Sequence, residues 1–300
     1  MIEPCNHAEA GNIIVSEQER QDRRLSETHL RQAALLLHTR GYIVLKQGLP
    51  LSLAEDCKSA FDVVLKDCFE SCEGDAWYQV AQKTQAVFWR RNFRWRIFPK
   101  LRMPFGDAWV LANPLIRPLL QNSLGDGHYC KFVSSDTCLK GAVIQSPHRE
   151  LNPGRTWEPT GLVVNVPLGQ CGLRNGPLEV WYGGSHLWNQ EVLETLDYDD
   201  DVQDDRNAEA EEFARLFPSR RLQLELGDVV IRDPAMMHRG TVNHTKVPRS
   251  MLTICYFRKD QEYDYGKATY NLDEEIWQSL DPEVQALFER EFKNSSIPIE

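Results

Sequence analysis

Three side chains that can bind a metal ion stand at two places in the sequence. His148 and Glu150 are separated by one residue in QSPHREL, and His238 lies ninety residues further on in DPAMMHRGTVNH. Residues i and i+2 of a β-strand project from the same face, so this imidazole and this carboxylate can reach one ion together. Two histidines and one carboxylate, with coordination positions left open, form the ligand set of non-haem Fe(II) oxygenases.

An arginine follows the second histidine at a distance that suits a dicarboxylate ligand. Arg249 stands eleven residues after His238 and precedes a run with strand character, 250–257. Its planar guanidinium can pair with a carboxylate through two hydrogen bonds, so Arg249 is the first choice for the distal carboxylate of 2-oxoglutarate. Arg239 and Arg232 are the alternatives for that role.

Two further histidines compete with this ligand set. His186, in WYGGSH, follows two glycines and has no carboxylate two residues later, which favours a supporting role in a loop. His244 lies six residues after His238, and both rings cannot easily reach one ion from one short hairpin. A lone histidine is more often a satisfied polar group than a ligand, so the prediction depends on His148 and His238 acting together with the carboxylate.

Composition and charge narrow the class of protein. The chain has 300 residues and a formal net charge of -10, which argues against nucleic acid or an anionic membrane as partner and leaves a small molecule. No apolar run approaches the roughly 18 residues of a membrane-spanning helix, and the N-terminus lacks the pattern of a secretory signal. The eight cysteines form no Cys-x-x-Cys pair, which favours buried thiols in a reducing compartment. We therefore expect a cytoplasmic protein, either a monomer or a homodimer.

The elements that must position these residues change from helical to β along the chain. We expect one domain with a loose arm over 1–24, a mostly helical support over 25–125, a β-rich core over 126–260 and a helical segment over 264–300.

Short apolar runs separated by turn-forming residues favour a sandwich or barrel for the core. These runs are 129–133, 140–144, 161–167, 177–181, 221–226, 228–231 and 250–257. The acidic segment 187–220 interrupts them. We expect that segment to carry a helix over about 208–216 or to cover the mouth of the barrel.

A second group of residues could contact the substrate. Residues 75–105 combine aromatic side chains with arginines such as Arg90 and Arg94, and in an acidic protein such a cluster can face an anionic ligand. Alternatively, these arginines pair with acidic groups elsewhere on the surface. Further candidates for the substrate are Lys131, Arg174 and Trp181.

The order of several short motifs resembles that of the phytanoyl-CoA dioxygenase family of Fe(II)- and 2-oxoglutarate-dependent oxygenases. The matching pieces are GYIVL after the first helix, His148 with Glu150, NGPLEVWYGGSH, LGDVVI, HRG with Asn243, and Arg249 with Ser250. The resemblance implies a double-stranded β-helix, or jelly-roll, with flanking helices. One departure is Glu150, because the family usually has aspartate there, and the extra methylene moves the carboxylate outward by about one bond.

The resemblance also implies the chemistry. Fe(II) would be held by His148, Glu150 and His238, and 2-oxoglutarate by the metal and by Arg249. With O2, such an enzyme converts 2-oxoglutarate to succinate and CO2 while it hydroxylates, desaturates or otherwise oxidises its substrate. The basic residues favour a small anionic metabolite or natural product.

Three further residues stand where they can orient ligands or contact the cosubstrate, or serve as ordinary strand residues: Gln145, Asn165 and Ser250. Halogenating members of the family have a small residue in place of the acid, so Glu150 favours oxygenation or desaturation over halogenation. The alternative functions are acyl-CoA hydroxylation within the same family and a non-catalytic or cupin-like jelly-roll that works without 2-oxoglutarate.

Overall fold

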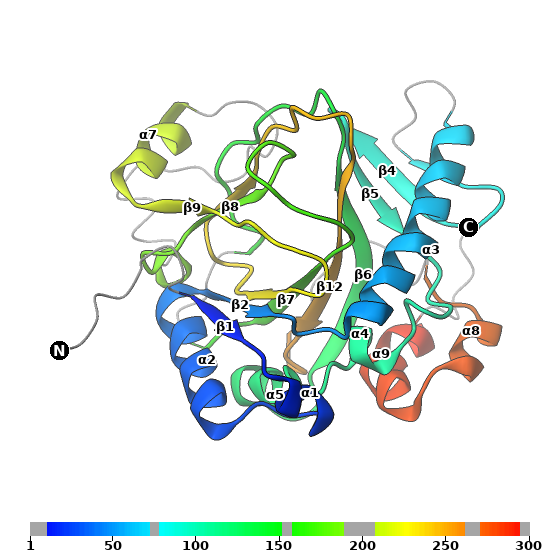
Figure 1. Cartoon of the computed structure of the whole chain (residues 1–300), viewed down its shortest axis with the longest axis horizontal. Coiled ribbons are helices and arrows are strands. Elements are labelled where there is room, and N and C mark those ends of the chain that lie inside the picture. Colours follow the sequence, from blue (N-terminus) through cyan, green and yellow to red (C-terminus); the bar gives the residue numbers. More distant parts are fainter. Residues whose placement is uncertain (1–10, 73–77, 152–157, 189–207, 262–270, 295–300) are drawn as a thin grey trace.

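Two β-sheets of unequal size organise the chain (Figure 1). The computed structural model describes residues 11–72, 78–151, 158–188, 208–261 and 271–294. Within these residues the strands are β1 Asn12–Ile14, β2 Tyr42–Lys46, β3 Tyr78–Val80, β4 Val87–Arg91, β5 Arg94–Phe98, β6 Tyr129–Cys138, β7 Gly161–Pro167, β8 Leu178–Trp181, β9 Ser219–Arg221, β10 Val229–Arg232, β11 His238–Gly240 and β12 Arg249–Phe257. The large sheet has the order β1-β2-β10-β7-β12-β6-β5-β4-β3, and the small sheet has the order β11-β8-β9. Neighbouring strands are antiparallel except β1 with β2.

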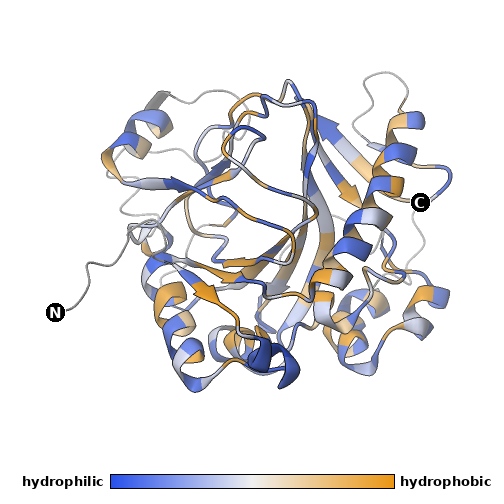
Figure 2. Cartoon of the chain, in the orientation of Figure 1, coloured by the Kyte–Doolittle hydropathy of each residue, from blue (hydrophilic) through white to orange (hydrophobic). Residues whose placement is uncertain are grey.

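Helices surround the margins of the large sheet. They are α1 Glu17–Gln21, α2 Glu27–Arg40, α3 Leu51–Glu70, α4 Ala108–Leu111, α5 Arg117–Leu124, the 3-10 helix η1 Ser185–Leu187, α7 Ala208–Leu216, α8 Glu274–Ser279 and α9 Pro282–Asn294. Figure 1 shows α2 and α5 along the lower margin, α3, α8 and α9 on the right, and α7 at the upper left. Apolar and polar residues alternate around these helices, as expected of helices with one buried face (Figure 2). In the described part of the chain, no helix is long and apolar enough to cross a bilayer.

Strand β12 shows how the large sheet separates two cores. Leu252, Ile254 and Tyr256 are buried in a cluster that includes residues of α2, α3 and α5. Met251 is buried in a different cluster, together with Val180 of β8. Because successive strand residues point to opposite faces, the helices cover one face of the large sheet and the small sheet covers the other, here called the inner face. The predicted jelly-roll with flanking helices is confirmed, and its described strands form a sandwich that does not close into a barrel.

Most of the predicted core runs are strands, but two are not. The run 221–226 overlaps β9 only at Arg221, and beyond it Leu224 makes only an isolated bridge to Cys171. The run 161–167 is β7, with the bounds expected, and 250–257 lies within β12. The predicted strand 140–144 is wrong, because β6 ends at Cys138 and Gly141, with φ 96°, lies in the turn that follows. The chain leaves the large sheet at this turn and crosses to the small one. Its apolar residues therefore mark a crossing between sheets and not a strand.

The structure agrees in part with what we predicted for the acidic segment 187–220 and for the support 25–125. The helix expected within the acidic segment 187–220 is present as α7. A cover over the barrel mouth would fall on 189–207, which lies outside the described residues. The support predicted over 25–125 is less helical than expected, because β2 joins the large sheet near one edge and β3, β4 and β5 form the other.

The described cysteines are free thiols, as the sequence predicted. Six of them are buried and Cys72 is half-buried. Burial raises the pKa of the Cys57 thiol to about 12, so this group stays protonated at neutral pH.

Residues 11–24 do not form the loose arm that we expected over 1–24. Strand β1 pairs with β2, and α1 begins with a capping box. Ser16 Oγ accepts a hydrogen bond from Glu19 N at 3.2 Å, and Glu19 Oε2 accepts one from Ser16 N at 2.9 Å. Glu19 Oε1 also accepts from Ser26 N, the residue that caps α2, at 2.7 Å. The S-x-x-E pattern is visible in the sequence, but the single turn of helix it opens is too short to show an apolar period.

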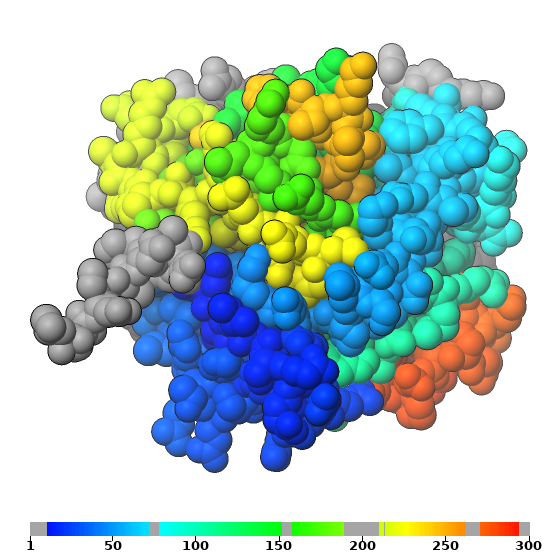
Figure 3. Space-filling model, in the orientation of Figure 1, coloured from blue at the N-terminus to red at the C-terminus, as the bar shows by residue number. Residues whose placement is uncertain are grey.

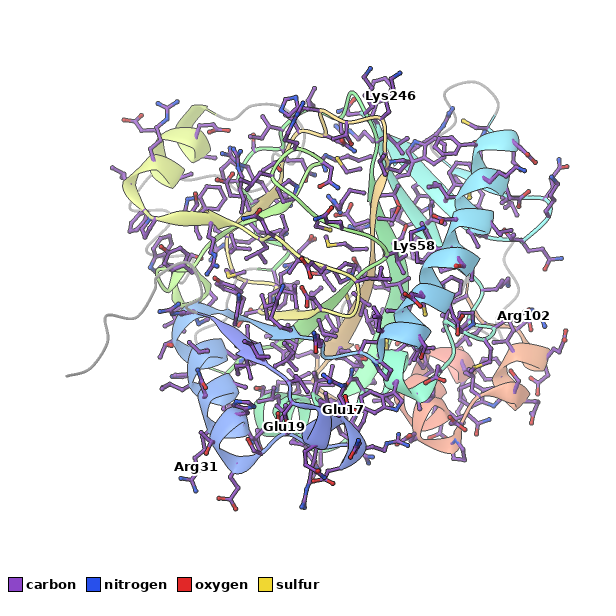
Figure 4. All side chains as sticks on the ribbon, in the orientation of Figure 1. Glu17, Glu19, Arg31, Lys58, Arg102 and Lys246 are labelled. Carbon is purple, nitrogen blue, oxygen red and sulfur yellow. The ribbon has the colours of Figure 1, made fainter. Side chains whose placement is uncertain are left out.

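One buried carboxylate therefore ties α1 to α2 at the lower margin of the molecule. Figure 4 labels Glu17 and Glu19 there, and the space-filling view shows the first helices covering the lower left of this face (Figure 3). Burial raises the pKa of Glu19, but the backbone donors of Ser16 and Ser26 outweigh it and lower the pKa to about 2.

We expect Glu19→Ala to lower the free energy of unfolding by roughly 2 to 3 kcal/mol at pH 7, to be measured by urea denaturation. Because folding lowers the pKa of Glu19, its contribution is complete above the ordinary pKa of 4.5 and is lost as the pH falls through about 2. The stabilities of wild type and variant should therefore converge in that range. Glu17→Ala is the matched control, since Glu17 is exposed on the same helix. Equal stability of Glu19→Ala and wild type at pH 7 would contradict the role of this carboxylate.

Candidate metal centre

Backbone hydrogen bonds hold the two halves of the predicted triad together. His148 N donates to His238 O, and His238 N donates to His148 O, each at 2.9 Å. Glu150 N donates to Pro234 O at 3.0 Å, outside the register of that pair. The segment that follows the turn after β6 therefore lies antiparallel to β11, and its residue 148 stands directly opposite residue 238.

The side chains of the triad converge. One ligand atom from each of His148, Glu150 and His238 lies within 4.8 Å of the other two. His238 Nε2 is 3.4 Å from Glu150 Oε1, and the two imidazole centroids are 4.6 Å apart. Both histidines are buried, with 5% and 3% of their surface exposed. Among the described residues this is the one group of three metal-competent side chains at such distances.

The orientation of both imidazoles is fixed by backbone carbonyls. His148 Nδ1 lies 2.8 Å from Ser146 O, and His238 Nδ1 lies 2.9 Å from Met236 O. A carbonyl oxygen only accepts, so each Nδ1 carries the proton and donates it. Each Nε2 then presents a lone pair. This is the arrangement by which proteins fix the tautomer of histidines that bind metals.

The local charges keep these groups in the forms that bind a metal. Burial raises the pKa of Glu150, but the positively charged groups around it, Arg96 among them, outweigh burial and hold the pKa well below its ordinary value. Burial and the nearby Arg232 lower the pKa of His238 to about 4. At neutral pH the site therefore offers a carboxylate and a neutral imidazole, as metal coordination requires.

Arg249, predicted to bind the distal carboxylate of 2-oxoglutarate, is buried with one donor to spare. Its Nε donates to Gly176 O at 2.8 Å, and its Nη1 donates to Asp136 O at 3.0 Å. Nη2 has no hydrogen-bond partner among the described residues. Burial opposes the charge of Arg249, but Asp136 outweighs it and raises the pKa of Arg249 above its ordinary value. A buried, charged and unpaired donor is what a ligand carboxylate can satisfy.

The two alternatives to Arg249, Arg239 and Arg232, differ in whether their guanidinium groups are already occupied by the fold. Arg239 Nε donates to Glu179 Oε2 at 2.6 Å, its Nη1 donates to Glu211 Oε1 at 2.8 Å, and its guanidinium lies 5.2 Å from the Trp181 ring centroid. These contacts attach α7 to the small sheet and occupy the guanidinium of Arg239. Arg232 lies beside the triad instead, with Nη2 4.0 Å from the Glu150 carboxylate.

Gln145 and Asn165, predicted to orient ligands or contact the cosubstrate, both have hydrogen-bond partners in the fold. Gln145 Oε1 accepts from Gly240 N at 2.8 Å, so it fixes the end of β11. A Cβ at Gly240 would lie 2.4 Å from Arg94 Nη1 and 2.5 Å from that oxygen, so both side chains would have to shift. Asn165 Nδ2 donates to Thr253 Oγ1 at 3.0 Å on the inner face.

Ser250 lies away from the ligands. Its side chain shares the parity of Leu252 and Ile254, which point toward the helices. Its Oγ accepts a hydrogen bond from Thr137 Oγ1 at 2.9 Å. The predicted contact between Ser250 and the cosubstrate therefore does not fit the structure, since Ser250 belongs to the helix-facing side of the sheet.

The other two histidines support the fold. His186 is buried, and its Nε2 lies 2.9 Å from His38 O at the end of α2. A Cβ at Gly41, which ends that helix with φ 77°, would lie 2.7 Å from His186 Nδ1. His244 is exposed on the loop after β11. Neither belongs to the triad.

Two of the predicted substrate residues are used by the fold. The Trp181 indole donates to Ala214 O of α7 at 2.8 Å, and its side chain is buried. Lys131 Nζ lies 3.0 Å from Glu291 Oε2 and attaches α9 to β6. The polar atoms of both side chains therefore hold helices in this fold.

The predicted arginines do not come together: Arg90 and Arg94 lie on β4 and β5, and Arg174 lies on the loop between β7 and β8. Arg94 Nη2 donates to Thr241 O at 2.8 Å and so connects β5 to the loop after β11. Arg90 lines a surface pocket of about 690 Å³ together with Phe93 and Trp95. Arg174 is exposed. Of these three, Arg94 is the one whose guanidinium acts electrostatically on Arg249.

Sequence reasoning missed Asp136. This residue pairs with Arg96 across β5 and β6, and its carboxylate lies 3.6 Å from Arg249 Nη1. Burial raises the pKa of Asp136, but Arg249, Arg94 and Arg96 outweigh it and lower the pKa. The predicted strand 129–133 ended too early to include it, because the polar residues 134–137 interrupt the apolar run although β6 continues to Cys138.

We expect alanine substitution of His148, Glu150 or His238 to reduce Co(II) binding at least tenfold, because each removes one of three protein ligands. Equilibrium dialysis with metal analysis measures this. His244→Ala is the control, since it removes an exposed imidazole outside the triad and should leave binding unchanged. Full metal binding by any of the three variants would remove that residue from the ligand set.

Comparison with known proteins supports the fold and identifies the family. The model of the family described as phytanoyl-CoA dioxygenase (PhyH) matches residues 37–251. The crystal structure of SnoN, a non-heme alpha ketoglutarate dependent epimerase from nogalamycin biosynthesis, aligns with a TM-score of 0.54 at 17% identity, over 78% of this chain and 84% of that chain. SnoN in complex with Fe3+, alpha ketoglutarate and nogalamycin RO aligns with a TM-score of 0.54 at 16% identity, over 78% and 85%. AviO1 from Streptomyces viridochromogenes Tue57 aligns with a TM-score of 0.50 at 17% identity, over 78% and 96%. At these identities the solved structures show the shared fold, and the family match over most of the chain shows that this protein belongs to the phytanoyl-CoA dioxygenase family.

Proposed function

We propose that this protein is an Fe(II)- and 2-oxoglutarate-dependent dioxygenase that oxidises a small anionic metabolite or natural product. The observation that carries the proposal is the convergence of His148, Glu150 and His238 on one point, with both Nε2 lone pairs available. Two histidines and a carboxylate leave coordination positions open for a bidentate cosubstrate and for O2. Family membership supports the same assignment.

Arg249 suits the distal carboxylate of 2-oxoglutarate. Its unpaired Nη2 is buried, and Asp136, which holds the other side of the guanidinium, is close enough to Glu150 for the two carboxylates to influence each other. Arg249 therefore belongs to the same electrostatic environment as the triad. Anchoring the cosubstrate there would fix its orientation at the metal before substrate is bound.

The division of labour follows from these residues. When bound, Fe(II) would activate O2 as the oxidant, and 2-oxoglutarate would supply two of the four electrons that O2 takes up while it is converted to succinate and CO2. His148, Glu150 and His238 would hold the metal, while Ser146 and Met236 keep the two rings in the required tautomer. The protein otherwise has to position the substrate bond to be oxidised.

The ligand set discriminates between the alternatives. A jelly-roll that had lost its oxidation chemistry would be expected to have a disrupted triad, whereas all three side chains are present and preorganised here. Glu150 also occupies the position that a halide needs in halogenating members of the family. We therefore favour hydroxylation or desaturation. The solved relative SnoN is described as an epimerase, so a change of configuration at carbon is a further outcome that the same centre could support.

Spectroscopy tests the metal and cosubstrate together. Anaerobic addition of Fe(II) and 2-oxoglutarate to the full chain should produce the weak visible absorption band of the chelate. Admission of air should then produce succinate. A protein that binds Fe(II) but shows neither the band nor succinate would exclude 2-oxoglutarate as cosubstrate and favour the cupin-like alternative.

A pair of arginine variants tests the cosubstrate site. Arg249→Ala should raise the dissociation constant for 2-oxoglutarate at least tenfold, measured from the chelate band, because one charge-assisted hydrogen bond to the carboxylate is lost. Binding of Fe(II) alone should be unchanged. Arg31→Ala is the control, because Arg31 is exposed on α2 at the lower left (Figure 4). An unchanged constant in Arg249→Ala would move the assignment to Arg232.

A further inference from the structure

Arg232 is a second buried guanidinium with a donor to spare, and the proposed function does not use it. Only 5% of its surface is exposed. Its Nε lies 3.4 Å from Asn165 Oδ1, and its Nη2 lies 4.0 Å from Glu150 Oε1, a long contact. Its Nη1 has no hydrogen-bond partner within the described ranges. A buried donor without an acceptor is costly, so an acceptor brought by a ligand would be stabilised there.

The strand register places Arg232 in a row between Tyr42 on one side and apolar residues on the other. On the inner face, Arg232 lies opposite Val163, Val163 opposite Cys255, and Cys255 opposite Phe132. Residues directly opposite each other in antiparallel strands share one face. Val163, Cys255 and Phe132 are packed in one cluster that also contains Phe98. The guanidinium therefore lies where a polar metal centre meets an apolar wall.

The next rows toward the other end of the inner face are polar and then charged. Asn165 lies opposite Thr253, and Thr253 opposite Ser134. Beyond them are Asp136 and then Arg249, which begins β12. Arg249 and Cys255 are six residues apart on that strand, or about 20 Å of extended backbone. Arg232 and Arg249 thus reach toward the triad from different ends of the inner face, as two separate anion sites would require.

The charged side chains around the triad carry an excess of positive charge that a further anion could balance. The charged side chains that influence one another there include more guanidinium groups than carboxylates: Arg94, Arg96, Arg232 and Arg249 against Asp136, Glu150 and Asp233, and burial raises the pKa of Asp233 to about 7. A ferrous ion adds two positive charges, and the dianion 2-oxoglutarate cancels them. The excess of positive charge then remains for the substrate, since charges in a buried site are normally paired.

We infer that Arg232 binds the anionic group of the substrate, and that the substrate is a small organic carboxylate whose apolar skeleton lies along Val163, Cys255 and Phe132. This inference rests on the proposed function and adds the substrate class to it. It assigns Arg232 to the substrate and Arg249 to 2-oxoglutarate. A charged group recognised at one end and an apolar wall beside it would together fix which carbon of the skeleton approaches the metal.

Binding of matched probes tests the inference. The full chain is loaded anaerobically with Fe(II) and saturating 2-oxoglutarate, and benzoate or benzyl alcohol is titrated by calorimetry. Wild type should bind benzoate about tenfold or more tightly than benzyl alcohol. Arg232→Met should raise the dissociation constant of benzoate at least tenfold, as expected for one lost charge-assisted hydrogen bond. The dissociation constants of benzyl alcohol and 2-oxoglutarate should stay within about twofold of those of the wild type. Arg232→Lys should retain an intermediate affinity for benzoate, and Arg31→Met should match wild type.

The contrary results are distinct. Benzoate affinity that is unchanged in Arg232→Met, or no preference of wild type for benzoate, would overturn the inference. A loss of 2-oxoglutarate affinity in Arg232→Met as large as in Arg249→Met would reassign Arg232 to the cosubstrate. Failure of the proposed function has another signature, which is the absence of a chelate band in wild type. In that case the benzoate titrations on protein without metal or cosubstrate still decide the role of Arg232. Thermal unfolding shows that each variant is folded, and Arg232→Lys keeps the charge beside Glu150.

Discussion

The candidate site depends on one reciprocal pair of backbone hydrogen bonds, between His148 and His238. These bonds join segments that are ninety residues apart and that belong to different parts of the jelly-roll. Once the two peptides are paired, each imidazole lies beside the other and turns its Nδ1 to the carbonyl two residues earlier in its own chain. The direction of both Nε2 lone pairs then follows from the backbone. Little rearrangement is left for the metal to impose, which favours binding.

The local parts of this arrangement could be predicted from the sequence, and the long-range parts could not. Strand β12 and helix α7 follow from residue patterns within their own bounds, and so does the place of Arg249 at the start of a strand. The run 140–144 has the composition of a strand but has no neighbour to pair with, because the chain is crossing between sheets there. For residues 11–24 the error was the opposite one, because a segment predicted to be loose is ordered. Their order comes from a strand partner, β2, and from the carboxylate of Glu19, neither of which an apolar period reveals.

The charged and aromatic candidates for the substrate also show what sequence cannot predict, because their partners are distant in the chain. Sequence shows that Lys131, Arg239 and Trp181 have groups able to bind a ligand, but it does not show what already binds those groups. In the fold, all three hold helices against the sheets, through a glutamate, a pair of glutamates and a backbone carbonyl. Arg94, Arg232 and Arg249 are different because, among the described residues, each keeps at least one buried guanidinium nitrogen without an acceptor. The useful distinction among arginines here is therefore the number of donors left over, and not their position in a motif.

The structure also explains why a glutamate can serve at position 150, where the family usually has aspartate. Glu150 follows the crossing segment, and its backbone is held to Pro234 in a bend after the His148 bridge, outside a regular strand. Its Oε1 still reaches within 3.4 Å of His238 Nε2. A carboxylate one methylene shorter on the same backbone would end about 1.5 Å further back. The length of the side chain thus compensates for the position of the backbone, and it also brings the carboxylate to the edge of the Arg232 guanidinium. The same methylene therefore couples the metal ligand to the arginine at the boundary of the apolar wall, which an aspartate at this position would hold at a greater distance.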